Sequence, residues 1–141
     1  MKKLLFLIVC VFALTLISCE KKDDASSGSS SSSSKNIVGK WAIYFPGQGI
    51  SQLCDYVEFK SNGDCWFYGA PNDKSASYED GYVIGDFDWY IQGKYTYHYS
   101  AETSQIDIYN YFSSKVEWIN NDEMCIPEDE WHCYRIKGFK K

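Results

Sequence analysis

The feature that most constrains this fold is a series of short segments in which apolar and polar residues alternate, with turn residues between them. A period of two sends successive side chains to opposite faces of a strand, and no stretch keeps the 3.6-residue period of a helix. The segments predict an all-β domain, a small antiparallel up-and-down β-barrel of about eight strands, because closure removes unpaired strand edges. The predicted strands span 39–45, 53–60, 87–92, 94–99, 105–110, 115–120, 123–127 and 131–137, with a short strand or an extended loop near 82–84.

The clearest supersecondary prediction is a hairpin at Asn62-Gly63. Both central residues of a type I′ turn need positive φ, and Asn-Gly is the pair best suited to it. A two-residue turn at this place pairs Phe59 with Trp66. The side chains expected to share one face are those of Val57, Phe59, Trp66 and Tyr68.

The N-terminus has the pattern of a secretory signal, with two lysines, an uncharged apolar run and a small residue before Cys19. The apolar run has about 14 residues, fewer than the roughly 20 that a membrane-spanning helix needs. Leu16-Ile17-Ser18-Cys19 resembles the lipobox of bacterial lipoproteins, whose cysteine receives diacylglycerol before cleavage on its N-terminal side. The resemblance implies removal of residues 1–18 and a lipid anchor on Cys19. The alternatives are an uncleaved anchor helix and a plain signal cleaved elsewhere.

The segment after Cys19 predicts a tether. Residues 20–24, Glu-Lys-Lys-Asp-Asp, resemble the surface-export signals of some Gram-negative lipoproteins, which implies a lipid-anchored protein displayed on the outer membrane. The alternative is a solvated charged spacer beside the head groups. Residues 25–35 are almost all serine and cannot bury enough apolar surface to become ordered. We therefore expect a signal peptide at 1–18, a disordered tether at 19–35 and one barrel domain at 36–141.

The charge of the domain excludes some partners. Residues 36–141 contain nine Lys and Arg against 16 Asp and Glu, a net charge near −7. Binding of nucleic acid, or of anionic lipid by the domain itself, needs clustered basic residues instead. We expect no nucleic-acid partner and no cofactor, and we assign membrane contact to the lipid anchor. The oligomeric state is left open.

Four cysteines lie in the predicted domain, at positions 54, 65, 125 and 133. The cell envelope is oxidising enough for disulfides, and four cysteines allow three pairings. A three-residue loop at 128–130 would place Cys125 opposite Cys133, so we expect this bridge, with Cys54–Cys65 as the second. A zinc site is disfavoured because the close Cys-x-x-Cys pairs of structural zinc are missing, and we expect no bound metal.

Several motifs of the domain follow the order seen in a known family. Val38-Gly39-Lys40-Trp41 is similar to the Gly-x-Trp start of lipocalins, and Phe59-x-x-Asn62-Gly63-x-x-Trp66 to the second hairpin of lipocalin-like domains in small bacterial lipoproteins. Further matches are Trp89-x-x-x-Gly93-Lys94-Tyr95, Ile106-x-Ile108, Val116-x-Trp118-Ile119, Met124-x-Ile126 and Cys133-Tyr134-Arg135.

The family resemblance implies a lipocalin-like barrel in which Trp41 packs at the closed end against Arg135. A guanidinium over an indole gains cation–π energy. The chain departs from the family in two respects. It lacks the Thr-Asp-Tyr-like second signature, and it is shorter than a typical lipocalin, which implies a small barrel filled largely by side chains.

The aromatic residues suggest two binding hypotheses. In the first, the protein is a membrane-anchored lipoprotein whose barrel mouth binds a small apolar or amphipathic ligand, unless the rings simply fill the barrel. The expected lining residues are Trp66, Tyr68, Trp89, Tyr95, Tyr97 and Trp118. In the second hypothesis, Tyr95, Tyr97 and Tyr99 form an outward platform that contacts a glycan or a partner protein.

We expect no enzymatic activity. Only His98 and His132 could act as a base near neutral pH, and no serine or cysteine lies in a nucleophile-elbow pattern. Asp86-x-Asp88 lacks the spaced carboxylate series of a calcium loop and is interpreted as a solvated acidic loop.

Overall fold

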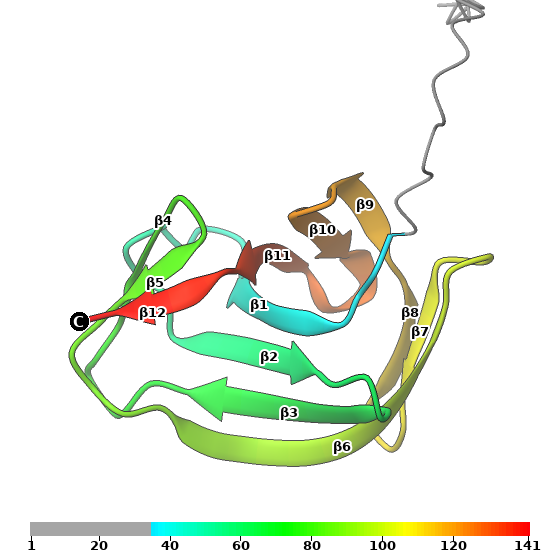
Figure 1. The fold of residues 1–141 in the computed structure, drawn as a ribbon, viewed down its shortest axis with the longest axis horizontal. Helices are drawn as coiled ribbons and strands as arrows, with labels where there is room; N and C mark the ends of the chain where they lie inside the picture. Colours follow the sequence, from blue (N-terminus) through cyan, green and yellow to red (C-terminus); the bar gives the residue numbers. More distant parts are fainter. Residues whose placement is uncertain (1–34) are drawn as a thin grey trace, which may run out of the picture. The chain divides into compact units, whose positions relative to one another are not determined.

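The computed structural model describes residues 35–141, which contain twelve strands and one 3₁₀ turn (Figure 1). The predicted signal peptide, the predicted lipidation site Cys19 and the predicted tether up to residue 34 lie outside the described residues. No helix in the described part is long and apolar enough to cross a membrane. The elements are β1 (Gly39–Tyr44), β2 (Asp55–Phe59), β3 (Asp64–Gly69), β4 (Ser77–Glu79), β5 (Tyr82–Ile84), β6 (Tyr90–Ser100), β7 (Gln105–Ile108), β8 (Phe112–Lys115), β9 (Glu117–Asn120), β10 (Glu123–Ile126), η1 (Pro127–Asp129), β11 (Trp131–Ile136) and β12 (Gly138–Lys140).

Nine strands form one antiparallel sheet in the order β8-β7-β6-β3-β2-β1-β11-β10-β9. The two edge strands are consecutive in the chain, since only Val116 separates β8 from β9. The first half of the segment 112–120 pairs with β7 and its second half with β10. If this segment is counted as one strand, the sheet curls into a nearly closed barrel of eight (Figure 1). The predicted all-β antiparallel barrel is confirmed.

A second, three-stranded sheet in the order β12-β5-β4 packs on the outside of the barrel wall. The segment 82–84, for which the sequence predicts a short strand or an extended loop, is β5. It pairs in parallel with β12 at the C-terminus, so that Gly138 lies opposite Tyr82 and Lys140 opposite Ile84. The insertion between β3 and β6 and the end of the chain therefore build one structure. The sequence analysis did not predict this pairing.

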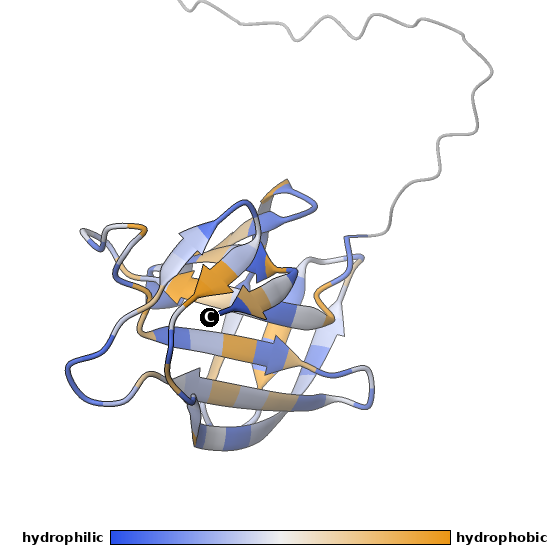
Figure 2. Cartoon of the chain, turned by 60° about the vertical axis from the view of Figure 1, so that its left-hand side comes forward, coloured by the Kyte–Doolittle hydropathy of each residue, from blue (hydrophilic) through white to orange (hydrophobic). Residues whose placement is uncertain are grey.

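The alternation along the strands produces two hydrophobic cores, one on each face of the wall (Figure 2). In β1, Trp41 and Ile43 point into the barrel, whereas Ala42 and Tyr44 point outward to the small sheet. The inner core contains Ile37, Trp41, Ile43, Val57, Phe59, Cys65, Phe67, Ile106, Ile108, Val116, Met124, Ile126, Trp131 and Cys133. The outer core contains Ala42, Tyr44, Leu53, Tyr56, Ala76, Val83 and Ile136.

The β2–β3 hairpin has a longer loop than the Asn62-Gly63 pair predicts. Phe59 lies opposite Cys65, not opposite Trp66, and the Lys60 amide donates to the Asp64 carbonyl over 2.8 Å. Three residues therefore form the loop, with Gly63 alone at a positive φ of 90°. This geometry is typical of three-residue hairpins that place glycine in the left-handed region.

Because the loop has one residue more than predicted, the side chains of β3 lie on the opposite faces of the sheet from those predicted. A shift of one residue moves every side chain of a strand to the other face. Cys65 and Phe67 consequently belong to the inner core, whereas Trp66 and Tyr68 point outward. The prediction that Trp66 and Tyr68 share a face with Val57 is wrong.

The expected disulfides are also wrong, for the same physical reason. Ile126 lies opposite Trp131, so four residues rather than three connect β10 to β11. Cys125 then faces His132 on the outer side, whereas Cys133 points into the barrel beside Met124. The second expected pair is also separated. Cys65 lies opposite Phe59, the last residue of β2, whereas Cys54 directly precedes Asp55, the first residue of that strand. All four cysteines of the described part are free thiols.

The four thiols should differ in reactivity. On the folded full chain we expect a maleimide to modify the partly exposed Cys54 and Cys125 before Cys65 and Cys133, which should react only after unfolding. Burial raises the pKa of the Cys65 and Cys133 thiols and removes them from reagent, and only the thiolate is nucleophilic. Peptide mass spectrometry without reductant measures the four sites. A pair that stays unmodified in denaturant would reveal a disulfide and contradict the structure.

Candidate functional site

The structure does not bring the six expected lining residues together. Tyr95, Tyr97 and Trp118 pack against the inner core, whereas Tyr68 and Trp89 pack against the outer one. Trp66 lies on the outer surface, where the Lys60 and Lys94 ammonium nitrogens lie 3.0 and 4.3 Å from its ring centroid. These residues divide between two faces of the wall and do not line a common mouth.

Three tyrosines of β6, Tyr95, Tyr97 and Tyr99, face the barrel interior. The Tyr97 ring lies 4.9 Å from the Phe59 ring, and its hydroxyl donates to the Lys60 carbonyl over 2.9 Å. The Tyr99 hydroxyl accepts a 2.9 Å hydrogen bond from Trp118 Nε1. An outward platform built from Tyr95, Tyr97 and Tyr99 is therefore excluded.

Aromatic side chains also plug one end of the barrel. The Trp131 ring lies 5.1 Å from Phe112 and 5.6 Å from Phe67, both in edge-to-face geometry. Tyr111, on the turn between β7 and β8, lies 5.5 Å from Phe67 and 5.3 Å from Tyr95. Edge-to-face and tilted contacts of this kind are favoured by ring quadrupoles. Phe67 and Trp131, which a ligand would need to displace at this end, belong to the inner core.

Trp41 and Arg135 close the other end. They lie opposite each other on β1 and β11, with the guanidinium carbon 4.2 Å from the Trp41 ring centroid. Arg135 donates to the carbonyls of Asn36 and Val38 over 2.7 and 3.0 Å, and Trp41 Nε1 donates to the Ile37 carbonyl over 2.8 Å. This pair therefore fastens the start of the domain to the barrel.

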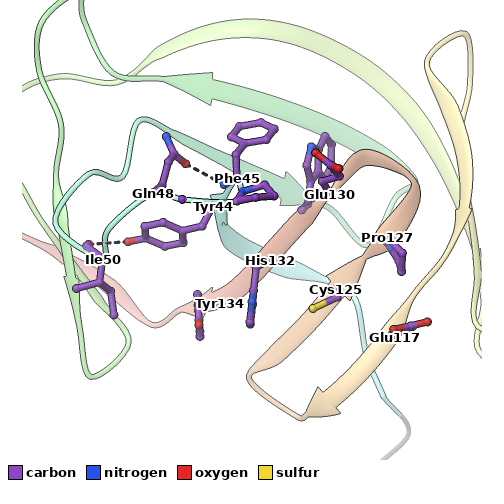
Figure 3. Close-up of a pocket in the computed structure, with 13 residues that line it drawn as sticks. Tyr44, Phe45, Gln48, Ile50, Glu117, Cys125, Pro127, Glu130, His132 and Tyr134 are labelled. Carbon is purple, nitrogen blue, oxygen red and sulfur yellow. Dashed lines mark hydrogen bonds between the residues drawn. The ribbon is translucent and has the colours of Figure 1, made fainter.

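A groove of about 500 Å³ lies on the outer face of the wall (Figure 3). Its floor is one row of directly opposed residues that crosses four strands, from Tyr44 on β1 through His132 and Cys125 to Glu117 on β9. Opposed residues in adjacent strands have Cβ atoms about 5 Å apart, so the row is continuous. The groove volume lies within the range of small-molecule sites.

The loop from β1 to β2 forms one wall of the groove, and its own hydrogen bonds hold it in place. The Tyr44 hydroxyl donates to the Ile50 carbonyl over 2.8 Å, and the Phe45 amide donates to Gln48 Oε1 over 2.9 Å (Figure 3). Gln48 and Ile50 line the groove, as does Phe45. Phe45 and Ile50 remain 41 % and 58 % exposed, so apolar surface is available beside a fixed backbone. The opposite wall is formed by Pro127 and Glu130.

The polar groups of the groove are held in defined states. His132 Nε2 lies 2.6 Å from Glu123 Oε1, and its ring stacks on Tyr134 with centroids 4.7 Å apart. Burial raises the pKa of the Cys125 thiol, and the carboxylates of Glu117 and Glu123 raise it further. Burial also raises the pKa of Tyr44. Near neutral pH the thiol and the phenol are therefore uncharged.

Sequence reasoning considered His132 and Cys125 but not the groove that contains them. The sequence suggests His132 only as a possible base and Cys125 only as one partner of a disulfide. The available signal was their alternation with buried residues in 124–126 and 131–133, which places them on one outer face once the hairpin register is known.

Comparisons of the chain with protein-family models, with curated proteins and with solved structures find no match.

The folded domain should lose stability as the pH rises above about 9. Burial raises the folded-state pKa of Cys65, Cys133 and Tyr56, and burial together with Glu58 raises that of Tyr68 to about 12. Between the ordinary and the raised pKa the folded state binds more protons than the unfolded state, so the free energy of unfolding falls with pH. Urea midpoints at pH 7, 9 and 10.5 measure this. Equal midpoints would contradict it, and Tyr68→Phe should flatten the decline above pH 10.

Proposed function

We propose that this chain is a small lipocalin-like lipoprotein of the outer-membrane surface that binds a small amphipathic ligand in its outer groove, not inside its barrel. The observation that carries the proposal is the preformed groove of about 500 Å³ whose lining combines aromatic rings with a few polar groups. Sites with this composition and size are the usual small-molecule sites of proteins.

Packing favours the groove over the barrel interior. Inside the barrel, the Trp41 and Trp118 rings lie 5.8 Å apart, and Trp118 donates to the Tyr99 hydroxyl. Tyr97 packs on Phe59. A ligand could enter there only by displacing packed side chains. Loss of the packing of one large core side chain costs several kcal/mol of stability. The groove needs no such change, because hydrogen bonds already fix its loop.

The groove chemistry supports binding over catalysis. His132 is engaged by Glu123 and stacked on Tyr134, and the Cys125 thiol stays protonated because its pKa is raised. An activated cysteine has the opposite property, a thiol pKa that an adjacent imidazole or another cation lowers, whereas burial and two carboxylates raise the pKa of Cys125.

The membrane anchor is supported by the Leu16-Ile17-Ser18-Cys19 motif and by the serine-rich segment that follows it. Metabolic labelling of cells with a palmitate analogue tests it, because the full chain should carry the label and Cys19→Ala should not. Protease treatment of intact cells tests surface display separately. A chain that is labelled but protected from protease would retain the anchor and exclude the surface location.

Groove binding can be tested with a neutral apolar fluorophore, N-phenyl-1-naphthylamine, titrated into the full chain. We expect the double variant Phe45→Ser, Ile50→Ser to bind it about five- to tenfold more weakly, because two half-exposed apolar side chains of the wall are lost. Ile119→Ser is the matched control, since Ile119 is 54 % exposed and does not line the groove. Unchanged affinity in the double variant would place the probe elsewhere and overturn the proposal.

A further inference from the structure

The charges along the groove point to a more specific ligand. We propose that the groove selects amphipathic ligands that carry an ammonium group, with Glu117 and Glu130 as the residues that determine this preference. The inference rests on the proposed function, because it assumes that the outer groove is the binding site.

The lining is acidic and contains no lysine or arginine. Of its 13 residues, Glu117 and Glu130 are carboxylates, and both are exposed. The basic lining side chain is His132, and the Glu123 carboxylate 2.6 Å away offsets any positive charge on its ring. The groove therefore presents a net negative charge to its ligand.

The two carboxylates lie at different places in the groove. Glu117 ends the floor row beside Cys125, whereas Glu130 follows η1 on the wall that Pro127 begins. In the view of Figure 3, Glu130 lies near Phe45, and Glu117 lies at the other side of the groove, beyond Cys125 and Pro127. A ligand lying along the groove can then place its apolar body on the rings and its charged end against a carboxylate.

The aromatic residues add to this preference. Among the aromatic lining residues, Phe45 is 41 % exposed and can present its ring to a ligand, whereas Tyr44 and Trp131 are each 5 % exposed. A cation within about 6 Å of an exposed ring is attracted by its negative face. An aromatic face does not attract a carboxylate or a phosphate, and the two glutamates would repel either anion. Neutral amphipaths should bind through apolar contact alone.

Three probes with the same eight-carbon chain separate these contributions, namely octylamine, 1-octanol and octanoate. Their dissociation constants for the full chain at pH 7 can be measured by calorimetry at low and at high salt. We expect octylamine, which is protonated, to bind at least about threefold more tightly than octanol, and octanoate to bind most weakly. High salt should reduce the differences, since exposed charges are screened.

Charge-neutral variants test the named residues. Glu117→Gln and Glu130→Gln together should abolish the advantage of octylamine and leave the affinity for octanol unchanged. Glu128→Gln is the matched control, because Glu128 is exposed on the same turn but does not line the groove. Equal affinities for octylamine and octanoate, or a double variant that keeps the preference, would overturn the inference. If none of the three probes binds, the groove itself is not the site, and the proposed function fails with it.

Discussion

Trp41→Ala is expected to lower the free energy of unfolding of the domain by about 3–5 kcal/mol, a large part of the roughly 5–15 kcal/mol of stability that a domain of this size has. The Trp41 side chain is 0 % exposed at the centre of the closed end, with its ring 5.8 Å from that of Trp118. Its removal leaves a cavity between β1, β9 and Arg135 that the packed strands cannot close. The Ile37 carbonyl also loses its donor. Urea unfolding followed by circular dichroism measures the change.

Trp41→Phe is the matched variant, because it keeps an aromatic ring but removes Nε1 and part of the volume. Its loss should be clearly smaller than that of the alanine variant. Thr96→Ala, a change on the exposed face of β6, should leave the midpoint within experimental error. A Trp41→Ala domain that unfolds at the same urea concentration as the parent would show that the closed end is not packed as described.

Arg135→Ala should lower the free energy of unfolding by about 2–4 kcal/mol, the second largest effect that we expect. The guanidinium lies over Trp41 and donates to the carbonyls of Asn36, Val38 and Asn121. Its removal leaves the partly buried Val38 carbonyl without this donor, removes the two more exposed hydrogen bonds and frees the start of the domain. Native-state hydrogen exchange should therefore show faster exchange at β1 before the rest of the barrel.

Arg135→Lys separates the contribution of the positive charge from that of the guanidinium geometry at the closed end of the barrel. Lysine keeps the positive charge beside Asp122, which lies 3.2 Å from Arg135 Nε, but cannot present a planar fork to several acceptors at once. We expect it to recover less than half of the loss. Lys115→Ala removes an exposed cation elsewhere in the barrel and should have no measurable effect. If Arg135→Lys were as stable as the parent, charge alone would hold the closed end.

Loop length limited how far the arrangement of the strands could be predicted. Asn62-Gly63 indicated a hairpin at the right place, but the loop has three residues, and Cys65 rather than Trp66 joins the inner core. The turn after β10 has four residues rather than three, which separates Cys125 from Cys133. Both loops can be closed in several ways by the same residues. The burial of the whole strand, and not the turn alone, selects among them.

The groove could not be predicted from the sequence, for a related reason. Its floor takes one residue from each of four strands, and its walls come from the loop after β1 and the turn before β11. Glu117 and Tyr44 are 73 positions apart in the chain and share the row only because two intermediate strands align them. No local pattern marks such a set.

The amino-acid sequence by itself determined the all-β class, the barrel and the positions of most of its strands, because alternation and turn residues act between neighbours in the chain. Only the tertiary structure decided which aromatic rings fill the interior, which thiols stay apart and which side chains meet in the outer groove. The physical reason is the two-residue repeat of the strand. One additional residue in a loop exchanges its faces, and only the packing of the complete wall determines which face lies inside.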